Sequence, residues 1–555
     1  MNRKYDIPVL IVGAGPVGLM LACELVRHGV ECRIIDKAGA ASDKSKALGI
    51  HARTLEIFDN IAIADEMIAA GHKGHGISAY SGGKRIAHVS LDQIPSRYQF
   101  VLMLPQNETE RMLAKHLASL GVQVERSVEL SGFTQDGDGV IATLKAADGR
   151  EEKCHSAWLA GCDGAHSTVR HTLGLEFEGE QYEESFWLAD VLLDFREADD
   201  ELYAYAGNEE MAVLFPMGHQ RWRIVGTRGP AEGDAAPTLP EVQTMLDKLI
   251  GGGVRAHDPF WLAHFSISRR RVKQYNVGRA FLCGDAAHIH SPAGGQGMNT
   301  GLQDAHNLAW KLALVANGDA KPELLASYQA ERHPVAAEVL RETDMMTRVI
   351  TLRSPIAKKV RDRLAPIFSA LEVVQDRASR ALSETAVNYR RSPIVSEHRS
   401  GLVESIQRAG ASGVGAWYDF AHGPAPGDRA PDVEYAMIDS GEVRRLNEVM
   451  RGPNFNLLLF SGIEDDRDLS DLFAIADSVK GRFGTHVSAH LIDASDAPQS
   501  HPHVTLIRDL SHLIHRAYGA GSRCIYLIRP DGYVGFRAQP PDQASLLANL
   551  GNILK

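Results

Sequence analysis

The chain has 555 residues, of which 44% are hydrophobic and 23% charged, and its formal net charge is −11. This balance argues against nucleic acid and an anionic membrane as main partners, because both require a cationic face. The length exceeds what one hydrophobic core holds and predicts two to four domains. The six cysteines include no CxxC pair, which favours reduced thiols in the cytoplasm, and we expect no membrane-spanning segment.

The segment 7–37 has the pattern of a dinucleotide-binding βαβ unit. An apolar strand leads into G-x-G-x-x-G at Gly13, Gly15 and Gly18, a helix follows, and a second apolar strand ends at Asp36. The first glycine permits a tight turn, the second lets a pyrophosphate approach the backbone, and the third allows close packing of helix and strand. The acidic residue suits a ribose. These residues predict a dinucleotide site without choosing between NAD and FAD.

Three further segments carry candidate contacts. SKALGIHARTLEIF (45–58) leads into a predicted helix, and LPQNETERMLAKHL (104–117) places Gln106 and Arg111 on another. Arg111 fits a surface position of that helix equally well. AWLAGCDGAHSTVRHTLGL (157–175) predicts a strand, a turn at Asp163-Gly164 and a helix. Asp163 suits either a ligand contact or a cap of the following helix, and we expect it to serve as both.

Between residues 177 and 268 apolar and polar residues alternate, which predicts half-buried strands. Ordinary packing explains most of the aromatic residues here, and the alternative is that one face covers a cofactor and lines an apolar substrate pocket. The basic triplet at 269–271 is expected to be a solvated face. The large side chains concerned are Trp187, Tyr203, Tyr205, Phe215, Met217 and Trp222.

A buried strand at 280–283 precedes GDAAHIHSPAGGQGMN (284–299). Asp285 therefore follows a strand end, where open α/β sheets place ligands. His288 and His290 are candidate metal ligands, but their spacing is poor for a helix and no other Cys/His cluster lies nearby. A histidine hydrogen-bonded to the backbone is the preferred interpretation. The helix that begins near Met298 would offer its positive end to negative charge on a cofactor.

The C-terminal part is predicted to be a separate domain. Residues 338–411 are predicted to be helical and carry no motif, and HGPAPGDRAPD (422–432) is typical of a boundary. Apolar strands follow at 455–460, 488–492, 524–528 and 533–536, with a last helix near Ala544.

The GxGxxG, DG and GD motifs in this order resemble the single-component FAD-dependent aromatic hydroxylases, the class A flavoprotein monooxygenases. GDAAHIHSPAGGQGMN is especially similar to phenol hydroxylase and its relatives. The resemblance covers roughly residues 6–336 and, more weakly, the C-terminal part. It implies an α/β fold, with a Rossmann-type FAD-binding domain interrupted by a substrate-binding β-sheet, a helical connector, and a C-terminal thioredoxin-like domain without redox activity. The implied ranges are 1–176 with 269–345, 177–268 (possibly with 72–103), 346–411 and 412–555.

The resemblance implies FAD as the cofactor, NAD(P)H as a transient reductant, no metal and a homodimer. Lys46 stands where many relatives have an arginine, and it lacks the planar fork of that residue. His290 and the carbonyl of Pro292 are the candidates for contact with a substrate hydroxyl. The implied FAD contacts are Gly13, Gly15, Pro16, Val17, Gly18, Asp36, Lys37, Lys46, Arg53, Gln106, Arg111, Asp163, Gly164, Asp285, Gly295, Gly297, Met298 and Asn299.

The implied reaction is hydroxylation of a phenolic or larger hydroxyaromatic, polyketide-type substrate by dioxygen through a flavin C4a-hydroperoxide. Leu48 stands where phenol hydroxylase has an aspartate, so the expected substrate is not phenol itself. Baeyer–Villiger oxidation and epoxidation use the same peroxide and stay open. A flavoprotein reductase is disfavoured by the missing CxxC and the missing second GxGxxG, and a non-catalytic flavin-binding protein is the remaining alternative.

Overall fold

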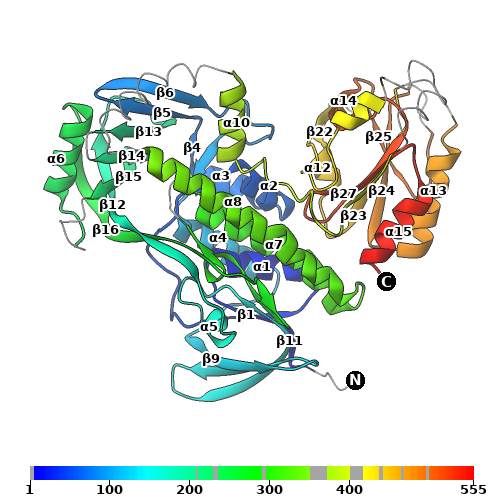
Figure 1. Ribbon diagram of the computed structural model, residues 1–555, viewed down its shortest axis with the longest axis horizontal. Helices are drawn as coiled ribbons and strands as arrows, with labels where there is room; N and C mark the ends of the chain where they lie inside the picture. The colour runs from blue at the N-terminus through cyan, green and yellow to red at the C-terminus, as the bar shows by residue number, and fades with distance from the viewer. Residues whose placement is uncertain are drawn as a thin grey trace. The chain divides into compact units, whose positions relative to one another are not determined.

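The chain divides into two units, each described by itself (Figure 1). Unit 1 comprises Met1–Val26, Glu31–His306 and His333–Ala386, and unit 2 comprises Arg27–Val30, Asn307–Arg332 and Val387–Lys555. The computed structural model describes residues 5–207, 210–228, 235–290, 295–350, 372–399, 415, 417–436, 442–463, 468–495 and 499–555.

Parallel strands form the centre of the first sheet of unit 1 and bring three motifs to one edge. The order is β17-β18-β11-β1-β2-β8, with β18 through β8 parallel, and β10 and β9 extend antiparallel from β11. Because the carboxyl ends of parallel strands meet, the residues that follow β1, β11 and β18 lie together. The bounds are β1 Ile7–Val12, β2 Cys32–Asp36, β8 Glu125–Arg126, β9 Val128–Gln135, β10 Val140–Ala146, β11 Glu151–Gly161, β17 Asn276–Val277 and β18 Ala280–Leu282.

A small three-stranded sheet, β3-β7-β4, lies in the same unit and is flanked in sequence by short helices. Its strands are antiparallel to one another. The bounds of these elements are β3 Gly49–Ile50, β4 His72–Gly74, β7 Val101–Met103, α1 Pro16–Arg27, α2 Ala52–Asn60, α3 Ala64–Ala70, α4 Gln106–Ser119 and α5 Thr168–Thr172.

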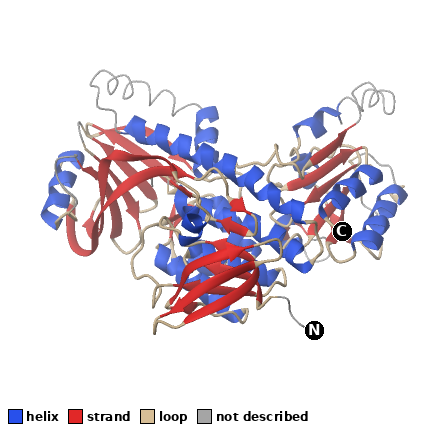
Figure 2. Cartoon of the chain, turned by 60° about the horizontal axis from the view of Figure 1, so that its bottom comes forward, coloured by secondary structure: helices blue, strands red, loops and turns tan. Residues whose placement is uncertain are grey.

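The second large sheet of unit 1 contains the alternating segment predicted from the sequence, joined by strands from residues 76–90. The order is β19-β16-β12-β15-β14-β13-β5-β6, and α6 covers one face (Figure 1). Figure 2 shows the red strands of the two large sheets as separate layers. The bounds are β5 Gly76–Ser81, β6 Lys84–Ser90, β12 Glu178–Asp194, β13 Glu201–Ala206, β14 Met211–Pro216, β15 Arg221–Arg228, α6 Leu239–Ile250, β16 Arg255–Arg271 and β19 His288–Ile289.

Two long helices follow the GD motif: α7 (Gln296–Asn317) and α8 (Ala326–Ile350). Of the predicted connector 346–411, residues 351–371 and 400–411 lie outside the described part. The described part contains α10 (Glu372–Leu382) and, where helix was expected, the strand β20 (Ser396–Arg399), which pairs with a strand of unit 2. The finer boundaries between the predicted domains stay a prediction.

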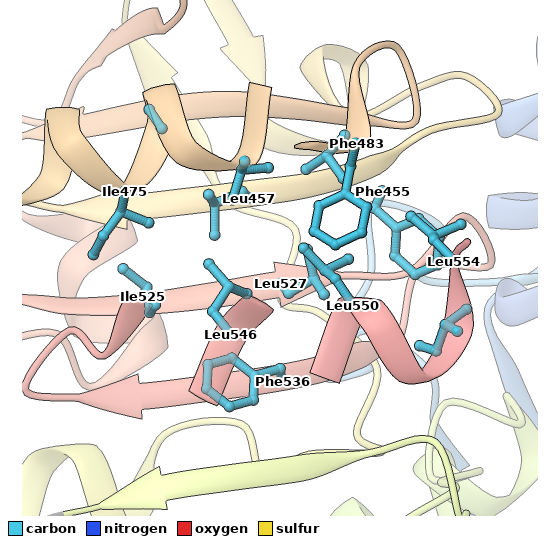
Figure 3. Packing of buried hydrophobic residues seen from close by; sticks show 14 of the residues in the cluster. Phe455, Leu457, Ile475, Phe483, Ile525, Leu527, Phe536, Leu546, Leu550 and Leu554 are labelled. Atoms are coloured by element: carbon cyan, nitrogen blue, oxygen red, sulfur yellow. The ribbon is translucent and has the colours of Figure 1, made fainter. Parts of the chain in front are cut away.

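Unit 2 is built on a six-stranded sheet of order β20-β27-β26-β23-β24-β25. Every residue of the central strand β23 is buried, because helices or loops cover both faces. Leu457 and Leu527 pack against α13 and α15 on one face (Figure 3), and Leu458 and Tyr526 belong to the core on the other face. The bounds are β23 Phe455–Phe460, α13 Ser470–Phe483, β24 Val487–Asp493, β25 Thr505–Arg508, α14 Leu513–Tyr518, β26 Cys524–Ile528, β27 Val534–Gln539 and α15 Gln543–Ile553.

Candidate functional site

The glycine loop after β1 has the geometry of a phosphate cradle. Gly13 has φ +101°, and a Cβ there would lie 2.4 Å from the carbonyl oxygen of Cys162. A Cβ on Gly18 would lie 1.9 Å from the carbonyl oxygen of Gly13, whereas a Cβ on Gly15 would meet no atom within 4 Å. Gly13 and Gly18 are therefore required by packing, and Gly15 borders open space beside the start of α1 at Pro16. That open side is where a pyrophosphate would approach.

Val17 joins the two glycine-rich segments of the sequence. A Cβ on Gly284 would lie 2.9 Å from Cγ2 of Val17, and a Cβ on Gly301 would lie 2.7 Å from the same methyl group. The missing side chains at Gly284 and Gly301 therefore leave room for Val17. The start of α1, the GD motif and the start of α7 consequently form one site.

Asp36 at the end of β2 holds the loop that follows β1. Its Oδ2 accepts a hydrogen bond from the N–H of Ala14 at 2.7 Å, and its Oδ1 accepts one from Ala38 at 2.8 Å. Nη1 of Arg126 lies 3.7 Å from Oδ2. Arg126 belongs to a two-residue strand that carries no sequence motif, so the sequence analysis missed it. Lys37 is exposed beside Asp36.

On α4, Glu110 is buried, whereas Arg111 lies on the solvent side of the helix. Arg111 is exposed and pairs with Glu108 at 2.9 Å, as its surface interpretation required. Burial raises the pKa of Glu110, an effect that Arg126 and Lys46 oppose. Gln106 accepts a hydrogen bond from the N–H of Ala47 at 3.1 Å and donates one to Glu110 at 2.8 Å. Gln106 therefore fixes the loop that carries Lys46, whose side chain is exposed.

The turn after β11 presents Asp163 and Gly164. Oδ2 of Asp163 accepts a hydrogen bond from the N–H of Val169 at 3.2 Å, while Ser167 caps the first turn of α5 by accepting from Arg170 at 3.0 Å. Burial raises the pKa of Asp163. Its Oδ1 is buried and has no hydrogen-bond partner among the described residues. An unsatisfied buried oxygen at this edge fits a hydrogen-bond donor supplied by a ligand.

Asp285 follows β18, as the sequence indicated, and is exposed to solvent. Protein packed around its carboxyl group nevertheless raises the carboxyl pKa, while His288 and Lys46 lower it. Such a carboxylate suits the hydroxyl groups of a ribityl chain.

His288 is structural, but its partner differs from the expected backbone group. Its Nε2 lies 2.7 Å from Oδ2 of Asp304 on α7, which also accepts a hydrogen bond from the N–H of Gly284 at 3.1 Å. Both side chains are buried. The ring of His290 is parallel to that of His288, with centroids 6.2 Å apart. His290 itself is half-buried, and Pro292 lies outside the described residues.

Asn299 fastens the start of α7 to the small sheet. Its Oδ1 accepts a hydrogen bond from the N–H of His51 at 3.0 Å, and its Nδ2 donates to the carbonyl oxygens of Gly49 and Gly295, both at 2.9 Å. Asn299 is fully buried, so its side chain serves to position the helix start. A Cβ on Gly297 would lie 3.5 Å from Cε1 of His290. The helix begins at Gln296, two residues before Met298, which is buried.

Arg53, predicted to line the flavin, is buried in α2 with its charge balanced locally. Its Nη1 lies 3.0 Å from Oε2 of Glu56, and its N–H donates to the carbonyl oxygen of Ser383 at 3.2 Å. Glu56 also accepts a hydrogen bond from Ser96 at 2.6 Å. The guanidinium group therefore has a structural ion pair.

A cavity of about 680 Å³ lies beside α5, and its lining includes two arginines and two histidines. Arg270, one of the three arginines predicted to form a solvated face, lies in the lining of this cavity. Alternation along β16 turns one of three consecutive arginines to this side. The lining residues are Ala165, His166, Arg170, His171, Leu175, Glu176, Phe177, Ser268, Arg270 and Ile289.

In unit 2 one group in the described part of the chain has the composition of a metal site. It comprises Asp477, His501 and His503. Nδ1 of His503 lies 2.7 Å from Asp477, and Nε2 of His501 lies 3.5 Å from it. Direct contacts between the aspartate and the two imidazole rings account for this geometry. All six cysteines are buried and none is in a disulfide bond. No helix in the described ranges meets the length and apolarity needed to span a membrane.

Comparison with known proteins agrees with this arrangement. Residues 6–343 match the family described as FAD binding domain. The chain is 34% identical over 560 residues to 6-methylpretetramide 4-monooxygenase of Streptomyces rimosus, covering 99% of this chain and 94% of the relative. Among solved structures, OxyS anhydrotetracycline hydroxylase from Streptomyces rimosus is 28% identical, with a TM-score of 0.72 and coverage of 99% of both chains.

A third similarity extends to different chemistry. The structure of the Diels-Alderase PyrE3 from pyrroindomycin biosynthesis is 26% identical, with a TM-score of 0.69 and coverage of 99% of both chains. The family match covers more than half of the chain, and the motifs of that family converge at one sheet edge. The protein therefore belongs to the FAD binding domain family and is an FAD-dependent aromatic monooxygenase.

Proposed function

We propose that the protein uses NAD(P)H and dioxygen to hydroxylate a hydroxyaromatic compound of polyketide type. The observation that carries the proposal is the single site built by Val17, Asp163 and Asp285, which joins all three FAD motifs. The names of 6-methylpretetramide 4-monooxygenase and anhydrotetracycline hydroxylase support a polycyclic phenol rather than a one-ring phenol.

The residues at the sheet edge would hold FAD in parts. The glycine loop would cradle the pyrophosphate, Asp36 would accept ribose hydroxyls, and Asp285 would accept those of the ribityl chain. The start of α7, fixed by Asn299, would present N–H groups to the flavin ring, where they stabilise negative charge. The bound flavin supplies the activation of dioxygen, and the protein supplies binding, orientation and exclusion of water.

The basic cavity beside α5 would receive the phosphate groups of NAD(P)H. Arg270 and His166 line it, and it adjoins the turn of Asp163 and Gly164. Arg170 is already committed, because its guanidinium donates to the carbonyl oxygens of Ala286 and Ala165. Replacing Arg270 with alanine is expected to raise KM for NADPH and leave FAD content unchanged. An unchanged KM would reject this assignment.

His290 remains the described candidate for contact with the substrate hydroxyl. It is half-buried beside Gly297 at the start of α7, whereas the neighbouring His288 is committed to Asp304. A half-buried imidazole can accept the proton of a phenol and so make the ring a better nucleophile. A His290→Gln variant is expected to retain FAD and lose most hydroxylation of bound phenol.

The experiment that tests the function is NADPH consumption by the FAD-loaded protein against a panel of phenols and polycyclic hydroxyaromatics, with product mass and structure. Hydroxylation predicts stimulated NADPH oxidation and an aromatic product that is 16 Da heavier than the substrate, because one oxygen atom is added. Baeyer–Villiger oxidation gives the same mass with an inserted ring oxygen. A product that forms without NADPH or dioxygen would instead favour cycloaddition. This alternative is considered because one structural relative is named a Diels-Alderase.

The C-terminal segment is proposed to be thioredoxin-like without redox function. Support comes from its β23-α13-β24 unit followed by β26-β27-α15, with the order β24-β23-β26-β27, the first pair parallel and the last pair antiparallel. The chain has no CxxC pair to make this segment a dithiol catalyst. The protein is also proposed to form a homodimer, and sedimentation equilibrium would test this oligomeric state.

A further inference from the structure

The group formed by Asp477, His501 and His503 in unit 2 comes from two segments that the fold brings together. Asp477 lies on α13, and the two histidines lie in the turn that leads into β25. The turn is closed by an antiparallel bridge between His501 and Val504, in which the N–H of Val504 donates to the carbonyl oxygen of His501 at 3.2 Å. We call the three side chains the histidine–aspartate cluster.

Each carboxylate oxygen of Asp477 faces a different imidazole ring. Oδ1 lies 2.7 Å from Nδ1 of His503, and Oδ2 lies 3.5 Å from Nε2 of His501. The three ligand atoms that the cluster offers all lie within 4.8 Å of one another. Around a tetrahedral Zn²⁺ with bonds of about 2.0–2.1 Å, neighbouring ligand atoms are about 3.4 Å apart. Movements on the order of 1 Å would therefore turn these contacts into metal bonds.

The ring of His501 is already oriented by its surroundings. Phe473, four residues before Asp477 on α13, stacks on this ring with centroids 4.7 Å apart and 11° between the planes. The N–H of His503 donates to Nδ1 of His501 at 3.4 Å, so Nε2 is the nitrogen that faces Asp477. On metal binding the ring proton would move to Nδ1, and this long hydrogen bond would be given up. A ring that is held in place loses little conformational freedom when it binds.

Asp477 has no lysine or arginine as an ion-pair partner in the described ranges. Its ion-pair contacts there are with the two imidazole rings. Asp471, at the start of the same helix, is instead paired with Arg523 at 3.1 Å. A carboxylate beside two neutral imidazoles leaves one negative charge that no permanent cation cancels. A divalent cation at the cluster would therefore be attracted by the carboxylate and coordinated by both rings.

The ligand types of the cluster select the metal. Two imidazole nitrogens and one carboxylate oxygen are typical of Zn²⁺, whereas Mg²⁺ and Ca²⁺ take oxygen ligands. The cluster contains no thiolate, which the softer Cu(I) ion prefers. Asp477 and His503 are exposed, so a cation reaches the cluster from solvent, and water can fill the fourth tetrahedral position.

We propose that the histidine–aspartate cluster binds one Zn²⁺, which ties the start of β25 to α13. β25 lies at the edge of the six-stranded sheet, where it pairs with β24 over four residues. A metal bond from α13 to the turn before this short strand would hold the sheet edge in place. The cluster belongs to unit 2 and the FAD motifs to unit 1, so the proposal does not depend on the proposed function. It goes beyond the resemblance, which implied no metal.

The test is isothermal titration of the FAD-loaded protein, produced without a histidine tag, with zinc chloride. Asp477→Asn and His501→Gln each remove one ligand and are expected to weaken Zn²⁺ binding at least about tenfold, the smallest loss typical even for an outer partner of a metal ligand. The matched controls are Asp319→Asn and His486→Gln. These two residues make a 3.7 Å contact in the same unit and belong to no three-ligand group in the described part of the chain, so their variants should leave Zn²⁺ affinity unchanged.

Hydrogen exchange locates the bound metal within the chain. Zn²⁺ is expected to slow exchange of the amides of β25 in the wild-type protein and to leave those of the His501→Gln variant unchanged. Each protein is compared with itself, with and without zinc chloride, so a variant of lower stability still gives a result. Chelation with EDTA should return the wild-type exchange rates to those of the metal-free protein.

Three results would overturn the proposal. The first is wild-type protein that binds no Zn²⁺, and the second is a Zn²⁺ affinity that is the same in the wild type, Asp477→Asn and His501→Gln. The third is Zn²⁺ that binds but slows exchange in segments other than β25. NADPH consumption is not a readout of this experiment, so a failure of the proposed hydroxylation would leave its outcome unchanged.

Discussion

Carboxyl groups with protein packed around them occur in two contrasting settings, one in each unit. At the strand edge of unit 1, burial raises the pKa of Asp163 and of Asp285, and the hydrogen bonds and charges around them do not compensate. In unit 2, burial alone would raise the pKa of Glu331, but Arg529 and Lys311 hold it well below its usual range. Asp163 and Asp285 therefore lack compensating partners, whereas Glu331 has Arg529 and Lys311. This contrast supports the proposed ligand role of the first setting and a structural role for the Glu331 network.

The network around Glu331 in unit 2 shows which partners are needed to balance a buried carboxylate. Glu331 accepts hydrogen bonds from Arg529 at 2.7 and 2.9 Å, from Lys311 at 2.7 Å and from Asn307 at 2.7 Å. Arg529 also donates to Asp531 at 3.0 Å. Burial lowers the pKa of Lys311 to about 8, although Glu331 opposes that shift. Each charge is balanced, so removing one partner leaves another buried and unpaired.

The largest expected effect is on this network. Arg529→Met should lower the free energy of unfolding of unit 2 by about 3–5 kcal/mol, because Glu331 and Asp531 lose their main cation. The measurement is urea unfolding at pH 7. Arg390→Met is the matched control: its exposed pair with Asp428 should cost less than about 1 kcal/mol. Equal losses in the two variants would contradict the contrast between the settings.

A second expected effect is a loss of stability in acid. Burial lowers the pKa of His490 on β24 from 6.5 to about 4. The folded state therefore favours the neutral ring, and its contribution is intact above pH 6.5 and lost as pH falls toward 4. The expected decrease is about 3 kcal/mol over that window. His490→Gln, which can still donate to Oδ1 of Asn456 at the 3.0 Å contact, should flatten the profile measured by urea unfolding. A variant with the wild-type slope would show that other groups cause the loss.

A substitution at the strand edge of unit 1 is expected to change FAD affinity rather than the free energy of unfolding. Asp285→Asn should weaken FAD binding about tenfold, the share of one charge-assisted hydrogen bond, while the unfolding free energy stays the same or rises. FAD fluorescence titration of the apoprotein measures the first and urea unfolding the second. Destabilisation without loss of FAD affinity would place Asp285 among the structural charges.

The smallest expected effect distinguishes adjacent residues of α4. Arg111→Ala should change FAD affinity less than twofold, because the side chain is exposed and paired with Glu108. Glu110 faces the loop of Lys46, so Glu110→Gln should change FAD affinity more than Arg111→Ala does. The same fluorescence titration decides between them. A larger effect at Arg111 would restore the contact that the resemblance implied.

Sequence order sufficed for the strand edge because parallel strands place their carboxyl ends together whatever their spacing along the chain. For α4 the sequence left two interpretations of Arg111 open. The structure places Arg111 on the exposed side of the helix and Glu110 on the buried side, because a helix turns about 100° per residue. The pairing of β5 with β13 joins segments more than 100 residues apart, and no local pattern encodes such a register. Lys311, about which the sequence analysis made no prediction, is fully buried. Its partners come from distant segments.

The hydrogen bond from Asn299 to Gly49 also orders events during synthesis. These residues are 250 positions apart, so the glycine loop leaves the ribosome long before the opposite wall of its site exists. At typical elongation rates that interval is on the order of 10–50 s. At the proposed FAD site, the opposite wall would therefore exist only after residue 299, when more than half of the chain has been translated. FAD bound there would then hold together two segments that were synthesised far apart in time.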